Sequence, residues 1–141
     1  MNPPIPRLIP QRAPLVMVDS LLTVGEEEAV TCLEVREDNF FLEEDGTLSE
    51  IGLIEHIAQS ASAFAGYKAL LYQNAKHPPL GYIGEITEFR CYARPQLGHR
   101  LQTRVVVLAE AGDVTLVRGE VKVEDTLVAD TRMKIFIERT E

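Results

Sequence analysis

The sequence predicts an α+β fold in which a strongly curved antiparallel sheet wraps around one long buried helix. Three observations lead to this expectation. In several stretches apolar residues alternate with polar ones, which is the period of a half-buried strand. One stretch, residues 51–73, instead lacks proline and has the composition of a helix. Its side chains are apolar or small on nearly every side, which indicates a helix enclosed by other elements.

The part of the chain before this helix predicts an arm and two strands. Residues 1–10 contain four prolines, and we expect an extended arm because proline lacks an N–H group and biases its predecessor away from helix. Residues 15–24 and 29–35 are typical of strands. Residues 47–50 fit a capping box, in which a hydroxyl group and a glutamate three residues later bind the free N–H groups at a helix start.

The part after the helix predicts four more strands. Alternating apolar residues mark each strand, and short turns separate one strand from the next. The last three strands form a meander. The expected strands cover residues 80–91, 101–109, 117–123 and 127–137. Two strands, one buried helix and then more strands are the order of the hot-dog fold. We expect a single hot-dog domain over residues 1–141, because a domain usually takes about 100–200 residues.

Composition and charge exclude several classes of protein. Hydrophobic residues make up 45% of the chain and charged residues 26%, which is globular composition and excludes a disordered chain. The formal net charge of −8 argues against nucleic-acid binding. Cys32 and Cys91 lack metal-ligand spacing, so we expect no metal site, and we expect no cofactor. No apolar run could span a membrane and the N-terminus is unlike a signal peptide, so we expect a cytoplasmic protein.

Three polar residues lie on one stripe of the predicted helix. Glu55, Gln59 and Ser62 follow one another at intervals of four and three residues, which places them on the same helix face. A carboxylate on a mostly apolar helix is costly unless it is paired, hydrogen-bonded or facing a cavity. The stripe therefore predicts a polar site. The alternative is that Glu55 is simply solvated or is satisfied by a partner chain.

Four motifs along the chain resemble, in order, those of 3-hydroxyacyl-[acyl-carrier-protein] dehydratases. Residues 9–19, IPQRAPLVMVD, look like the N-terminal L-P-H-R-x-P-x-L-x-x-D motif of that family. Residues 55–61, EHIAQSA, are similar to its helix motif E-A-x-A-Q-A-A. Residues 84–98 follow the order of its later strand and R-P-x-x-P-G turn, and residues 128–133 resemble its last strand. The resemblance spans residues 8–137 and implies the hot-dog fold.

Two departures from the family pattern concern its histidines. The resemblance would put a catalytic histidine in a G-H-F-P-G loop after a double phenylalanine. Here Phe40 and Phe41 precede a shorter segment, residues 42–52, that contains no histidine. Gln11 stands where the first motif has a histidine. The shortened loop looks more like a divergent branch that resembles the dehydratase-like proteins of aryl-polyene pigment clusters.

The resemblance also implies a set of site residues. In the family, a base removes the C2 proton of a 3-hydroxyacyl thioester and an acid helps the hydroxyl group leave. N–H groups at the helix start polarise the thioester carbonyl. Glu55 would act on the hydroxyl group, and Gln11 can orient a water or a carbonyl but cannot exchange protons. The expected catalytic residues are Glu55, Gln59 and Gln11, and the expected substrate-binding residues are Ser62, Gly52 and Phe41.

The chain's own histidines are poor candidates for the base. His56 follows Glu55 directly, so it points about 100° away on the helix, and we expect it in the core or at an interface. His77 and His99 lie in a loop and a turn, and we expect both at the surface. A partner chain could still bring a histidine near Glu55.

Three functions are compatible with these residues. The first is a hydro-lyase that acts on 3-hydroxyacyl or enoyl thioesters in fatty-acid or polyene type synthesis. The second is a hot-dog acyl thioesterase that uses Glu55 without a histidine. The third is a non-catalytic acyl-thioester-binding or partner subunit that has lost the histidine–glutamate dyad.

Charge and topology predict the partners. The acyl thioester would be carried by acyl carrier protein or by coenzyme A. Carrier proteins are acidic, and a cluster of arginines would attract one. The expected carrier-binding residues are Arg90, Arg94, Arg100 and Arg104. The alternative is a solvated sheet edge with mixed charges. We also expect a homodimer or a higher even oligomer, because a single unit of this fold leaves a sheet edge exposed.

Overall fold

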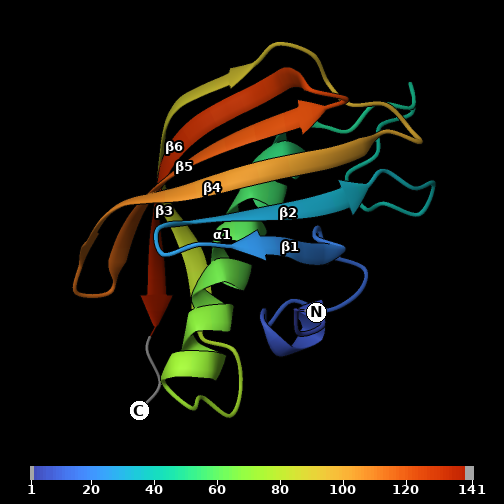
Figure 1. The fold of residues 1–141 in the computed structure, drawn as a ribbon. Helices are drawn as coiled ribbons and strands as arrows, with labels where there is room; N and C mark the ends of the chain where they lie inside the picture. The colour runs from blue at the N-terminus through green and yellow to red at the C-terminus, as the bar shows by residue number, and fades with distance from the viewer. Residues whose placement is uncertain (1, 139–141) are drawn as a thin grey trace.

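A six-stranded antiparallel sheet curves around one helix in the computed structural model, which describes residues 2–138. Figure 1 shows the helix, α1 (Glu50–Tyr72), along the concave side of the sheet. The strand order is β1-β2-β4-β5-β6-β3, which confirms the predicted curved antiparallel sheet and the meander of its last three strands. The strands are β1 (Ser20–Val24), β2 (Glu28–Glu34), β3 (Leu80–Cys91), β4 (Arg100–Ala111), β5 (Val114–Val123) and β6 (Thr126–Glu138).

The start of α1 differs from the predicted capping box. Ser49 is the N-cap, and its hydroxyl oxygen accepts a hydrogen bond from the backbone N of Gly52 at 3.0 Å. Thr47 instead lies in a turn, where its hydroxyl group bonds Asp45. Both residues carry a hydroxyl group and precede the helix. Ser49 caps it because the hydroxyl group of Thr47 is already bonded to Asp45.

Most of α1 is buried, as its composition predicts. Leu53, Ile57 and Phe64 are almost completely inaccessible, and small side chains allow close approach on other faces. A Cβ atom at Gly66 would clash with the backbone of Leu8, and a Cβ atom at Gly119 would clash with Ile57. Glycine is therefore required at the points where the arm and the sheet touch the helix.

The N-terminal arm is not extended throughout, contrary to the prediction. Residues Ile5–Arg7 form a 3-10 turn, and Leu8 and Ile9 after it are completely buried. The turn is held by Arg12, whose guanidinium donates to the carbonyl oxygens of Ile9 at 2.8 Å and Pro6 at 3.0 Å. Burial of apolar side chains therefore bends a proline-rich segment that local preference alone would leave extended.

The first strand is shorter than predicted, because it begins at Ser20 rather than at residue 15. Leu15 and Met17 bond to the helix instead of to a neighbouring strand. Gln59 bonds the backbone of Leu15 and Met17, and His56 bonds the backbone of Met17. These side chains satisfy backbone groups that a sheet would otherwise pair.

The two edges of the sheet differ. At β1, the side-chain amide of Asn2 donates to the carbonyl oxygens of Leu21 at 2.8 Å and Leu22 at 3.2 Å. At the opposite edge, β3 pairs with β6 on one side only among the described residues. Two irregularities interrupt that pairing, and residues 84–88 are exposed. The sheet therefore has one covered edge and one open edge.

Candidate active site

A pocket between α1, the N-terminal arm and β3 brings together four of the residues predicted for the site. They are Gln11, Glu55, Gln59 and Ser62. The side chains from α1 lie on one stripe, as their spacing predicts. The remaining walls come from Ala58, residues 81–83 of β3 and Ile135 of β6. The pocket therefore lies beside the open edge of the sheet.

Glu55 is held in position by Gln59. The side-chain amide of Gln59 donates from Nε2 to Glu55 Oε1 at 2.9 Å and to the carbonyl oxygen of Leu15 at 2.8 Å. Its Oε1 accepts from the backbone N of Met17 at 2.6 Å. Gln59 is 1% exposed, while Glu55 is half-buried. A fully bonded amide thus orients a carboxylate that still reaches the pocket.

Gln11 carries the one buried polar side-chain atom without a hydrogen-bond partner in residues 2–138. That atom is its carbonyl oxygen, Oε1, and Gln11 lines the pocket with Glu55. A buried acceptor without a donor is costly. An N–H or O–H group of a bound molecule would satisfy it.

His56 lies in the core, as predicted, and not in the pocket. It is completely buried. Its Nδ1 donates to the carbonyl oxygen of Met17 at 2.6 Å, so in the neutral ring Nε2 accepts from the hydroxyl group of Thr103 at 2.6 Å. Burial lowers the pKa of His56 to about 4. With both nitrogens bonded, His56 ties the helix to β4 and to the segment before β1.

The other two histidines also lie outside this pocket. His77 is exposed in the loop after α1, and His99 lies in the turn before β4, where its Nδ1 accepts from the backbone N of Gln96. Neither lines the pocket. The pocket lining described here therefore contains a carboxylate and amides but no histidine.

Two predicted substrate-binding residues lie at the start of α1 rather than in the pocket. Gly52 packs against the side chain of Phe41, where a Cβ atom would clash. The backbone N–H of Gly52 is bonded to Ser49. Phe41 also contacts Phe40 edge to face, with ring centroids 5.2 Å apart. Neither residue is among those that line the pocket with Glu55.

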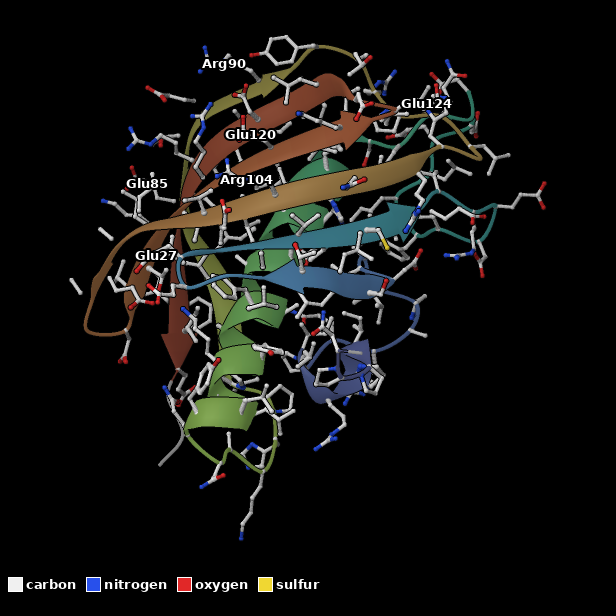
Figure 2. All side chains as sticks on the ribbon, viewed as in Figure 1. Glu27, Glu85, Arg90, Arg104, Glu120 and Glu124 are labelled. Atoms are coloured by element: carbon white, nitrogen blue, oxygen red, sulfur yellow. The ribbon has the colours of Figure 1, made fainter. Side chains whose placement is uncertain are left out.

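The four arginines of the predicted carrier patch do not form one cluster. Figure 2 shows Arg90 at the β3 edge and Arg104 on the outer face of β4. Arg90 pairs with Asp130 at 3.2 Å, and Arg104 pairs with Glu28 and with Glu120 at 3.4 Å.

The other two arginines lie on either side of the turn that precedes β4. Arg94, in the loop before that turn, pairs with Asp45 at 3.3 Å. Arg100 lies at the start of β4, where it lines a hollow with Arg104. Three of the four arginines therefore already face carboxylates of this chain.

Residues 2–138 contain neither a cluster of metal ligands nor a membrane-spanning helix. No group of three or more histidine, cysteine, aspartate or glutamate side chains is arranged to hold a metal ion. No helix in this part of the chain is long and apolar enough to cross a membrane.

Sequence reasoning missed the wall that β3 contributes to the pocket. Gly81, Tyr82 and Ile83 lie in a stretch that the alternation predicts as a strand. Alternation shows which side chains share a face, but it does not show that this strand crosses next to Glu55. The glycine at position 81 is the one signal in the sequence. A Cβ atom there would lie 3.0 Å from Ser62 Oγ, so the absence of a side chain allows the close approach.

The amino-acid sequence matches a known protein family. A family model described as ApeP dehydratase matches residues 3–140. No curated protein sequence matches the chain.

Solved structures resemble the chain over most of its length. One is the dehydratase heterocomplex ApeI:P from Xenorhabdus doucetiae, with a TM-score of 0.90, 21% identity, and 99% of this chain and 94% of that chain covered. Another is the PaaI protein of E. coli, with a TM-score of 0.65, 14% identity, and coverages of 82% and 80%. A third, smu.793 from Streptococcus mutans bound to acetyl CoA, has a TM-score of 0.66, 11% identity, and coverages of 86% and 90%. These likenesses confirm the hot-dog fold.

Proposed function

The chain belongs to the ApeP-like dehydratase family, and on that premise we propose that it is a subunit of a dehydratase for 3-hydroxyacyl thioesters. In this reaction a base takes the C2 proton, and the released electron pair forms the C2–C3 double bond. The C3–O bond breaks, and the departing hydroxyl group takes a proton and leaves as water. The products are an enoyl thioester and water.

Glu55 is the residue we propose to donate the proton to the departing hydroxyl group. The observation that carries this role is the shared pocket of Glu55, Gln11, Gln59 and Ser62. Gln59 fixes one oxygen of the carboxyl group through a 2.9 Å hydrogen bond. Preorganised groups of this kind cost no rearrangement during the reaction.

Gln11 is the residue we propose to hold the substrate hydroxyl group. Its buried Oε1 lacks a donor in residues 2–138, and a 3-hydroxyacyl chain carries one hydroxyl donor at the reacting carbon. The enoyl product has lost that donor. An acceptor at this position would therefore bind the hydroxyacyl form better than the enoyl form.

We propose that the base is a histidine of a partner chain. The histidines of this chain do not line the pocket, and His56 has both ring nitrogens bonded in the core. The pocket lies beside β3, whose outer side has no strand partner among the described residues. A related fold occurs in a complex named as a dehydratase heterocomplex. A second hot-dog chain that pairs with β3 could supply the histidine.

The carrier of the acyl group is proposed to be acyl carrier protein, with coenzyme A as the alternative. A structure of the same fold is named as bound to acetyl CoA, which supports a thioester as the ligand. The paired arginines predict that attraction to an acidic carrier is weak, because three of the four already face carboxylates on this chain.

The central experiment measures enoyl absorbance and free thiol in parallel. The chain is purified alone and together with a hot-dog dehydratase subunit that has a histidine, and each sample receives 3-hydroxyacyl and enoyl thioesters. Enoyl formation without thiol release, by the mixed complex only, is the expected result. Glu55→Gln should lower that rate by about a hundredfold or more, whereas the matched control Glu50→Gln, exposed at the helix start, should not.

The same assay distinguishes the two alternatives. Thiol release by the chain alone, lost in Glu55→Gln, would favour a thioesterase. Binding of acylated carrier with neither reaction, and a mixed complex whose rate is indifferent to Glu55→Gln, would leave a non-catalytic partner subunit and contradict the proposed role of Glu55.

A further inference from the structure

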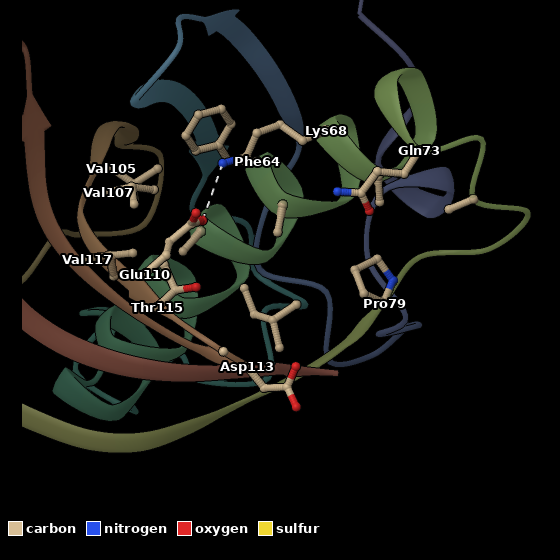
Figure 3. Close-up of a pocket in the computed structure, with 16 residues that line it drawn as sticks. Phe64, Lys68, Gln73, Pro79, Val105, Val107, Glu110, Asp113, Thr115 and Val117 are labelled. Carbon is tan, nitrogen blue, oxygen red and sulfur yellow. Dashed lines mark ion pairs between the residues drawn. The ribbon is translucent and has the colours of Figure 1, made fainter. Parts of the chain in front are cut away.

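A second, apolar cavity lies between the C-terminal half of α1 and the sheet (Figure 3). Its helix wall is Ala61, Ala65 and Ala69, which share one face because they are four residues apart. The facing wall is made of Val105, Val107 and Val117. The cavity has no lining residue in common with the Glu55 pocket. None of the residues proposed for the reaction therefore lines this cavity.

The size of the helix side chains creates this cavity. In the first half of α1, Ile57 reaches the sheet so closely that a Cβ atom at Gly119 would clash with it. One turn later the helix presents Ala61, and the facing residues are valines, so the gap is not filled. An unfilled apolar cavity loses dispersion contacts on its walls, and water gains little from entering it. An apolar molecule that fits restores those contacts.

The rim of the cavity is polar. Lys68 of α1 lies 3.8 Å from Glu110 of β4 and 4.3 Å from the centre of the Phe64 ring. Figure 3 shows this ion pair reaching from the helix to the strand, with the valines on one side of the cavity and Gln73 on the other. Asp113 also lines the cavity, away from this ion pair. Polar groups at the rim and apolar groups inside suit an amphiphilic molecule.

The charges at the rim select the head group of that molecule. Among the described lining residues, one side chain, Lys68, is a cation and two, Glu110 and Asp113, are carboxylates. The cation is already paired with Glu110. An anionic head at this pair would have to displace Glu110 from the cation and would lie beside its carboxylate, whereas an uncharged head can hydrogen-bond to either partner.

We propose that this cavity binds an unbranched alkyl chain with an uncharged polar head, the head lying at the Lys68–Glu110 pair. From Ala61 to Ala69 the helix rises about 12 Å, which matches a chain of roughly eight carbons. The proposal does not depend on the dehydratase reaction, because no residue of the Glu55 pocket contributes to the cavity.

The experiment uses the full chain and the fluorescent apolar probe N-phenyl-1-naphthylamine. Saturable fluorescence enhancement is expected, and 1-octanol should displace the probe at about threefold lower concentration than octanoate. Ala65→Phe, which fills the cavity, should abolish probe binding. Leu71→Phe, at an exposed position of the same helix, is the matched control and should keep it. Circular dichroism reports whether each variant folds.

A second pair of variants keeps the test decisive. If Ala65→Phe does not fold, Ala69→Val is expected to weaken probe binding several-fold by narrowing the same cavity. Glu110→Gln frees Lys68, so octanoate should then displace the probe at about the same concentration as 1-octanol. The proposal is overturned if the probe does not bind saturably, if the folded cavity variant binds it unchanged, or if octanoate equals 1-octanol in the unmodified protein.

Discussion

Gln59 contacts two parts of the molecule at once, because its one amide orients Glu55 and bonds the backbone of the segment that precedes β1. Its three hydrogen bonds reach Glu55, Leu15 and Met17 at 2.6–2.9 Å. The buried His56, three residues before Gln59 on the helix, also bonds Met17. Buried polar side chains of this helix therefore bond backbone groups that have no strand partner. The same hydrogen bonds hold Glu55 in place.

Replacing Gln59 with leucine should cost stability as well as activity. The change leaves the buried N–H of Met17 and the carbonyl of Leu15 without their partner, so we expect the free energy of unfolding to fall by about 2–4 kcal/mol. Urea denaturation measures the loss. Gln102→Leu, at an exposed position of β4, is the control and should change it little; equal losses in both variants would contradict this account.

Acid should weaken the fold through His56. Burial lowers the pKa of His56 to about 4, while the unfolded chain has the ordinary value near 6.5. The unfolded state therefore binds the proton first as pH falls, so stability is full above about pH 6.5 and declines toward pH 4. We expect the free energy of unfolding to be roughly 2 kcal/mol lower at pH 5 than at pH 7.5.

The measurement for His56 is urea denaturation across that pH range. His56→Gln removes the titrating group, so its stability should be lower at neutral pH but should depend less on pH. A variant with the same pH dependence as the unmodified protein would assign the effect to other groups.

At the scale of elements, the arm and the helix meet through Gly66. A Cβ atom there would clash with the backbone of Leu8. Alanine favours helix over glycine by about 1 kcal/mol, so local preference predicts that Gly66→Ala stabilises. We expect the opposite, a loss of about 1–3 kcal/mol in the free energy of unfolding, measured by thermal or urea denaturation.

Gly52→Ala provides the comparison for Gly66→Ala. Its new Cβ atom would lie 2.6 Å from the Cβ atom of Phe41, which is a smaller overlap than the one with the backbone of Leu8 at position 66. The loss should therefore be smaller. A larger loss at Gly52 than at Gly66 would show that the arm yields more readily than its buried leucine suggests.

The sequence predicts the elements well where one period dominates, and less well where side chains compete with the sheet. The strand at residues 80–91 and the helix have the expected bounds to within one residue. The predicted first strand is too long because Gln59 and His56 form hydrogen bonds with the backbone of Leu15 and Met17. The stripe of Glu55, Gln59 and Ser62 follows from helix geometry alone. The contribution of β3 to their pocket depends on topology, which local patterns do not contain.

At the scale of the whole molecule, the open β3 edge is where we expect a partner. Leu80, Tyr82 and Ile86 on this strand are 55%, 63% and 38% exposed, so three large apolar side chains lie along one unpaired strand, which is typical of an interaction site. Mixing the chain with a histidine-bearing hot-dog subunit should give a 1:1 complex in sedimentation velocity. Ile86→Asp on β3 should prevent it and Leu108→Asp on β4 should not; a complex that survives Ile86→Asp contradicts pairing at this edge.

Charge also acts at this scale, because the chain has a net charge of −8 and an acidic carrier protein would be repelled by most of it. If Arg94 contributes to docking, carrier binding should weaken several-fold between about 50 mM and about 300 mM salt. Arg94→Glu should weaken it at low salt, whereas Arg7→Glu on the arm should not. Fluorescence anisotropy of labelled carrier measures this, and salt-independent binding would remove the arginines from the docking model.

The hydrogen bonds that Asn2 makes to Leu21 and Leu22, together with the proposed pairing at β3, predict how large an assembly can grow. A sheet with two open edges can add a new chain at each end and extend into a filament. With the β1 edge occupied by its own arm, each chain has one edge left to offer. If two such edges pair as proposed, growth would stop at a closed pair. Losing Asn2 would reopen the second end, and the same fold would then be able to polymerise.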